Sequence, residues 1–180
     1  MGALIKTRHQ TDGSAIQGSR QFLTFLLNGE MFAIDILSIK EIIEYGHVTP
    51  VPMMPNFIHG VINLRGAVVP VVYLSVRFGH SATATTRRTC IVIIEAESDA
   101  GKQDIGVIVD SVSEVLEIPD AEIEPPPSFG AKIRADFIGG MGKVDGRFVI
   151  ILNVSRVLSI DEMTLLTVIG GEKTRAAEAA

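Results

Sequence analysis

The side chains that could support catalysis or bind a metal are few in this sequence. The histidines are His9, His47, His59 and His80. None stands at a spacing from the single cysteine that is typical of a zinc site. Cys90 begins a strand-like apolar run, which favours a small core residue over a nucleophile. Residues 139–142 are rich in glycine but lack the spacing and the GK[ST] ending of a phosphate-binding loop. We therefore predict no catalytic site, no metal and no cofactor.

Two charged residues, Glu41 and Arg65, could instead contribute to binding. They are either unrelated surface charges, whose pairing contributes only about 0–1 kcal/mol, or a pair that bridges a short helix and a hairpin and shapes a groove for a partner. Four aliphatic residues could line such a groove or could equally belong to the core: Ile39, Val68, Val112 and Val115.

The hairpin that would carry Arg65 spans residues 60–74. Two β-rich runs flank Arg65 and Gly66, and glycine allows the positive φ that a tight hairpin turn needs. Pro70 cannot donate a ladder hydrogen bond, which places the second run at a sheet edge or at a bulge. Because edge strands expose unpaired backbone groups, this segment suggests binding to another chain.

Short strands and tight turns dominate the rest of the chain. Strands are predicted at residues 22–27, 31–34, 90–94, 105–109, 112–118 and 148–152, with hairpin turns at Asn28-Gly29 and Asp145-Gly146. Asp35 is expected to cap a short helix that contains Ile36, Ile39 and Ile43 at helical spacing.

Two further helical segments are predicted near the end of the chain. Asn153 is expected to cap a short turn through Val157. Ser159 and Glu162 form a capping box that begins a helix ending near Ile169.

A weak internal similarity relates residues 28–37 to residues 145–154, since both run from a turn through a strand to a polar cap. Many short strands at this spacing are typical of small barrels or a sandwich. We predict a mainly β fold of two antiparallel barrels that share a hydrophobic core. Residues 21–169 would form this domain, with a disordered tail at 1–20 and a flexible tail at 170–180.

Composition narrows the class of partner. A net charge of −5 argues against nucleic acid and against an anionic membrane surface. The longest apolar run, residues 67–74, is too short for a membrane span. A single cysteine favours a reducing, cytoplasmic setting. Phe129 follows three prolines, and it is either tucked under its loop or an exposed anchor for a second partner.

Four motifs stand out together: Asn63-Leu64-Arg65-Gly66 with Val68-Val69-Pro70-Val71-Val72, Ile34-Asp35-Ile36 leading to Glu41-Ile42, Val51-Pro52 with Gly60-Val61, and Gly106-Val107-Ile108-Val109-Asp110-Ser111-Val112. In combination they resemble the CheW family, the coupling proteins of bacterial chemotaxis. The similarity extends over about residues 21–168. Tyr73-Leu74-Ser75 departs from the pattern, because the family often has Asp-Leu-Arg there.

The resemblance implies two SH3-like barrels and a non-enzymatic scaffold that joins chemoreceptor tips to the histidine kinase CheA. It implies a cytoplasmic protein, located at receptor arrays beneath the inner membrane and monomeric outside them. By position, the receptor-binding residues would be Ile39, Glu41, Arg65, Gly66, Val68, Val112 and Val115. Barrel-end surfaces that include Glu124 and Phe129 would bind the regulatory domain of the kinase.

Two alternatives stay open on the sequence alone. One is the same fold as a regulatory domain of the kinase or as a module linked to a receiver domain. The other is a small β-barrel enzyme or ligand-binding protein, which would need convergent polar residues in a pocket.

Overall fold

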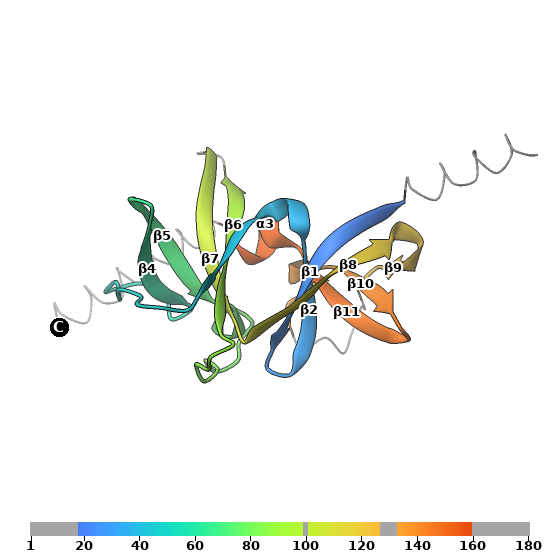
Figure 1. The fold of residues 1–180 in the computed structure, drawn as a ribbon, viewed down its shortest axis with the longest axis horizontal. Coiled ribbons are helices and arrows are strands. Elements are labelled where there is room, and N and C mark those ends of the chain that lie inside the picture. The colour runs from blue at the N-terminus through green and yellow to red at the C-terminus, as the bar shows by residue number, and fades with distance from the viewer. Residues whose placement is uncertain (1–17, 99–100, 127–132, 160–180) are drawn as a thin grey trace, which may run out of the picture.

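The computed structural model describes residues 18–98, 101–126 and 133–159, and it consists of two β-sheets that lie side by side along the long axis (Figure 1). The first sheet, hereafter the first barrel, has the order β8-β1-β2-β11-β10-β9. Its strands are β1 (Ser19–Leu27), β2 (Glu30–Asp35), β8 (Ser111–Pro119), β9 (Ile123–Glu124), β10 (Ile138–Val144) and β11 (Arg147–Leu152). The second sheet, hereafter the second barrel, has the order β3-β6-β7-β5-β4. Its strands are β3 (Ile39–Glu44), β4 (Ile58–Leu64), β5 (Ala67–Tyr73), β6 (Cys90–Ser98) and β7 (Gly101–Val109).

Short helices connect these strands. They are the 3-10 helices η1 (Ile36–Ser38), η2 (Asp120–Glu122) and η3 (Ala135–Phe137), and the α-helices α2 (Leu74–Arg77) and α3 (Val154–Val157). The chain passes from the first barrel to the second through η1 and returns at Asp110, between β7 and β8. The first barrel is therefore assembled from both ends of the described chain, and the second is inserted within it.

One hydrophobic core joins the two barrels, as predicted. Phe25 and Phe32 of the first barrel belong to the same buried cluster as Val92, Ile94 and Val107 of the second. Each barrel also has a smaller core of its own, around Val71 and Ile93 in the second barrel and around Phe22 and Ile151 in the first.

The strands are not all antiparallel, so that part of the prediction is wrong. β11 runs parallel to β2, and β5 runs parallel to β7. Neither pair is joined by a hairpin, and long connections allow parallel neighbours where two-residue turns do not.

Three predicted hairpin turns are confirmed. Asn28-Gly29, Arg65-Gly66 and Asp145-Gly146 each have positive φ at both central residues, from 49° to 85°, which is the backbone of a type I′ turn. Asn63 fixes the second turn, because its Oδ1 accepts a hydrogen bond of 2.9 Å from the Gly66 N–H.

The expectation that Pro70 marks a sheet edge or a bulge is wrong. β5 is an interior strand beside the edge strand β4, and the bulge of the β4–β5 ladder lies between Ile58 and Gly60, not at Pro70. Pro70 pairs with Val61 of β4 and immediately precedes Val71, where the pairing with β7 starts. The proline therefore lies where β5 has a neighbour on one side, and its missing N–H leaves the ladder intact.

The predicted helix over residues 36–43 is wrong beyond its first turn. Asp35 does act as a cap, since its Oδ1 accepts from the Leu37 N–H at 2.9 Å, but η1 ends at Ser38 and β3 follows. Pairing with β6 and the strand preference of isoleucine outweigh the local helical spacing.

Some of the other predicted strands and helices are confirmed, and some lie outside the described residues. The strands at residues 90–94, 105–109 and 112–118 and the turn capped by Asn153 are confirmed. β1 begins at Ser19, two residues inside the predicted N-terminal tail. The rest of that tail, the C-terminal helix after Ser159, the C-terminal tail and Phe129 lie outside the described residues.

The internal similarity that we predicted pairs the wrong segments. The hairpin β10–β11 with α3 matches β4–β5 with α2, at a constant offset of 80 residues. The strand registers correspond residue by residue, including a bulge between Ile58 and Gly60 in one hairpin and between Ile138 and Gly140 in the other. The chain thus contains a structural repeat that relates one barrel to the other.

Arg77 holds the two barrels together. Its side chain leaves α2, beside the second barrel, and its guanidinium carbon lies 4.9 Å from the ring centre of Phe57 and 4.8 Å from that of Phe137. Its Nε donates a 3.0 Å hydrogen bond to the carbonyl of Val157 in α3. Cation–π contact and a charge-assisted hydrogen bond both act across the junction.

Candidate functional site

Glu41 and Arg65 form an ion pair on the second barrel. Arg65 Nη2 lies 2.6 Å from Glu41 Oε2, and the two residues come from β3 and the β4–β5 turn. The pair therefore bridges an edge strand and a hairpin, whereas we expected a helix and a hairpin. The Arg65 side chain is 77% exposed and that of Glu41 only 24%, so the guanidinium covers the carboxylate.

One oxygen of Glu41 is left without a hydrogen-bond donor. Oε1 is buried, and no donor from the described part of the chain reaches it. Buried polar atoms are normally paired, so the ion pair with Arg65 leaves this carboxylate incompletely satisfied.

Apolar side chains lie on the same strand and the same hairpin as this pair. Val68, on the same hairpin as Arg65 and Gly66, is 72% exposed. Ile39 is half-buried and packs against the shared core. Ile42, beside Glu41, is 42% exposed and was missed, because the helical interpretation of this segment gave it no role. β3 alternates along its length: Ile39, Glu41 and Ile43 are half-buried, and the residues between them are exposed. This alternation was the signal in the sequence that could have identified Ile42 as exposed.

The other two residues of the predicted receptor set lie in the first barrel. Val112 is half-buried against the shared core, and Val115 is 49% exposed on β8. Figure 1 shows β8 well apart from the β4–β5 turn. The structure thus brings Glu41, Arg65, Gly66 and Val68 together and leaves Val115 in a second, separate place.

Of the two predicted kinase-binding residues, only Glu124 is described. It is exposed on β9 of the first barrel, where it pairs with Met141 of β10. Phe129 lies outside the described residues.

The two positions that depart from the family pattern face inward. The Tyr73 ring packs against His59 at a centroid distance of 4.4 Å, and Ser75 is buried. Tyr45 Oη lies 3.0 Å from His59 Nε2, which extends the cluster. Burial lowers the pKa of His59 and raises the pKa of Tyr73. These side chains therefore consolidate the second barrel and present no charge to a partner.

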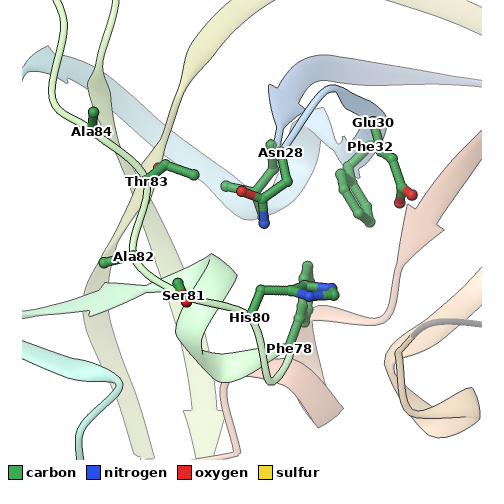
Figure 2. Close-up of a pocket in the computed structure, with 10 residues that line it drawn as sticks. Asn28, Glu30, Phe32, Phe78, His80, Ser81, Ala82, Thr83 and Ala84 are labelled. Carbon is green, nitrogen blue, oxygen red and sulfur yellow. The ribbon is translucent and has the colours of Figure 1, made fainter.

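A pocket of about 450 Å³ opens between the β1–β2 hairpin and the stretch that follows α2 (Figure 2). Phe32 and Phe78 form its apolar wall, and Asn28, Glu30 and His80 are among its polar side chains. The sequence gives no signal for this pocket, because its lining comes from two segments that are far apart in the chain, residues 27–32 and 78–84.

The described residues offer no obvious chemistry. They contain no group of three or more histidine, cysteine or acidic side chains that could hold a metal ion. Burial raises the pKa of Cys90, which disfavours the reactive thiolate. No helix among the described residues has the length and apolar character needed to cross a membrane.

Comparisons with known proteins agree with the fold. The CheW-like domain family matches residues 21–162. Chemotaxis protein CheW of Klebsiella aerogenes is 34% identical over 147 residues, covering 82% of this chain and 86% of the relative. Chemotaxis protein CheW of Rhizobium meliloti is 32% identical over 145 residues, covering 81% of this chain and 91% of the relative.

A solved structure is similar as well. The scaffolding protein TtCheW from Thermoanaerobacter tengcongensis superimposes with a TM-score of 0.70 at 34% identity, over 77% of this chain and 86% of that one. The two-barrel fold, the family match over most of the chain and relatives above 30% identity lead to one conclusion. The chain belongs to the CheW family.

Proposed function

We propose that this CheW-family scaffold couples the cytoplasmic tips of chemoreceptors to the histidine kinase CheA. Family membership makes it a signalling scaffold of chemotaxis and not an enzyme. The observation that carries the proposed receptor contact is the Glu41–Arg65 pair, which lies at the surface with an unpaired carboxylate oxygen beneath it.

The receptor-binding surface is centred on this pair. A helical receptor tip can lay apolar side chains on Val68, with Ile42 and Ile39 of β3 as further apolar contacts, and set a polar side chain beside the exposed Arg65, which is helix-in-groove recognition with one polar anchor. Arg65 is the exposed charge at the centre of this surface and therefore contributes to register and specificity. Val112 and Val115 belong to the proposed receptor set as a second group, on the first barrel.

The kinase contact includes Glu124, which is exposed on β9 of the first barrel, and Phe129, which is assigned by its position in the family. Binding of receptor and kinase at different places lets one scaffold hold both at once. Each weak contact then raises the effective concentration of the other partner. The working location is the cytoplasm, at the receptor arrays, and the protein is a monomer outside them.

A pull-down at physiological salt tests this proposal. The wild-type chain and Arg65→Glu are incubated with a chemoreceptor signalling fragment and, separately, with the regulatory domain of CheA. We expect wild type to bind both, and Arg65→Glu to lose receptor binding about tenfold while keeping the kinase. The exposed pair adds only about 0–1 kcal/mol to stability, so the variant should stay folded.

Lys143→Glu is the matched control, since it makes the same charge reversal beside the equivalent hairpin turn of the first barrel. It should bind the receptor as wild type does. Failure of the folded wild type to bind either partner would refute the coupling role, and equal loss in both variants would refute the assigned surface.

A further inference from the structure

The repeat within the chain places a counterpart of the Glu41 surface on the first barrel. β3 pairs with β6 as β8 pairs with β1, and each ladder has an irregularity at a glutamate: it lies just before Glu41 in β3 and includes Glu114 in β8. Through these registers Val112 corresponds to Ile39, Glu114 to Glu41 and Val115 to Ile42. The sequences agree, since residues 39–44 read IKEIIE and residues 112–117 read VSEVLE.

The hairpins complete the correspondence. At the offset of 80 residues, Asp145 takes the place of Arg65, and Phe148 takes that of Val68. Phe148 is 50% exposed and Val68 is 72% exposed, so both hairpins present an apolar side chain at the same position.

The two surfaces differ in one decisive charge. In the second barrel Arg65 covers Glu41, whereas in the first barrel the equivalent residue is an aspartate. None of the ion pairs among the described residues includes Glu114, Asp145 or Arg147. Glu114 is accordingly exposed, while Glu41 is half-buried.

The first barrel is consequently open at this end. A cavity of about 370 Å³ lies there, and its lining includes Thr24, Met31, Glu114, Leu116, Asp145 and Phe148. Arg147 also lines it. Thr24 Oγ1 accepts from the Glu114 N–H at 3.2 Å and donates to the Glu114 carbonyl at 2.9 Å, so the backbone that carries this carboxylate is fixed.

We propose that this opening is a second docking site, which accepts a segment of another protein that brings an arginine beside an apolar side chain. The guanidinium would take the place that Arg65 occupies in the second barrel, against Glu114 and Asp145, while the apolar neighbour covers Phe148. Arg147 sets the limit of this acidic patch and favours a single incoming cation. A second copy of the chain is a poor occupant because each copy carries a net charge of −5. Glu124 does not line the cavity, so this site is separate from the proposed kinase contact.

Two peptides serve as probes against the ¹⁵N-labelled full chain: acetyl-Leu-Arg-Leu-amide and acetyl-Leu-Glu-Leu-amide. We expect the arginine peptide to shift the backbone amide signals of Glu114, Asp145 and Phe148 in a saturable way that weakens with salt, and the glutamate peptide to leave them unmoved. Shifts that are equal for both peptides, absent at millimolar peptide or centred elsewhere would overturn the proposal.

Substitutions then test whether the negative charges of Asp145 and Glu114 bind the arginine peptide. Asp145→Arg recreates the arrangement of the second barrel in the first, and arginine tolerates this backbone because Arg65 already adopts φ 53°, close to the 49° of Asp145. We expect it, and Glu114→Gln, to weaken the arginine peptide at least tenfold. Glu97→Arg makes the same charge change on the exposed end of β6 and should alter binding less than twofold.

An unchanged affinity in folded Asp145→Arg would overturn the proposal. So would a wild-type dimer, measured by light scattering, that Asp145→Arg dissociates, because the occupant would then be a second copy. The test uses neither receptor nor kinase, so its outcome is independent of the proposed coupling function.

Discussion

Replacing Arg77 with methionine should weaken the junction between the barrels more than any comparable surface substitution. Methionine keeps the apolar stem and removes the guanidinium that lies between Phe57 and Phe137. Each cation–π contact of a partly desolvated arginine contributes about 1 kcal/mol. The hydrogen bond to the Val157 carbonyl contributes about 1.5 kcal/mol, as expected for a charged donor.

These contributions share one side chain and are not independent, so we expect a loss of about 3 kcal/mol in the free energy of unfolding. With a urea dependence of about 2 kcal/mol/M, the midpoint would move down by about 1.5 M. Urea titrations followed by circular dichroism and by tyrosine fluorescence measure this shift. If the barrels uncouple, the two signals should also cease to coincide.

Arg134→Met is the matched control. Arg134 also lies over Phe137, at 4.4 Å, but its side chain is half exposed and its ion pair is with Asp136, two residues away. This arginine is expected to contribute under about 1 kcal/mol. Equal losses in the two variants, or a loss below about 1 kcal/mol for Arg77→Met, would refute the argument that Arg77 joins the barrels.

Three further outcomes follow from single residues. Gly106→Ala should lower the melting temperature by about 4–8 °C, because an added Cβ would lie 2.7 Å from Ile91 Cγ2 in a packed core and cost about 2 kcal/mol. Gly46→Ala is the control and should leave the melting temperature unchanged, since no atom lies within 4 Å of the added Cβ. Burial holds the pKa of His59 below its ordinary 6.5, so the unfolded chain binds the proton more readily than the folded chain, and the free energy of unfolding should fall as the pH drops below 6.5. Thermal melts at pH 7.5 and 5.5 should show a smaller loss for His59→Asn than for wild type. Val68→Glu should change the free energy of unfolding by less than about 0.5 kcal/mol, since Val68 is 72% exposed, yet weaken receptor binding about tenfold in titration calorimetry.

Turn chemistry was the part of the fold that the sequence predicted best. Asn28-Gly29 and Asp145-Gly146 specify type I′ turns through their own backbone preferences, so no distant residue is needed to place them. The shared core was also predicted, from strand spacing and from an internal similarity that paired the wrong segments. The parallel pairs did not, because they depend on which distant strands meet, and that is decided by packing across the whole chain.

β3 shows how local pattern can mislead. Ile36, Ile39 and Ile43 fit a helical face, but Ile39, Glu41 and Ile43 fit the alternation of a strand equally well. Only pairing with β6 decides between the two. A comparison within the chain would have resolved the choice, because IKEIIE matches VSEVLE, which was assigned to a strand.

The comparison of the two barrels also explains why the predicted receptor-binding residues lie in two places. The resemblance to a family gave one set of receptor-binding residues, and the structure divides it into two equivalent halves, around Glu41 on the second barrel and around Glu114 on the first. Strand, bulge, glutamate and exposed apolar residue are common to both, so these features cannot distinguish the two surfaces. Position 65 or 145 does, because an arginine there covers the glutamate and an aspartate leaves it exposed. On the proposal of a second docking site, one change of charge in a turn separates the binding preferences of the two barrels, while the strand pairing and the bulge of the hairpin are the same in both.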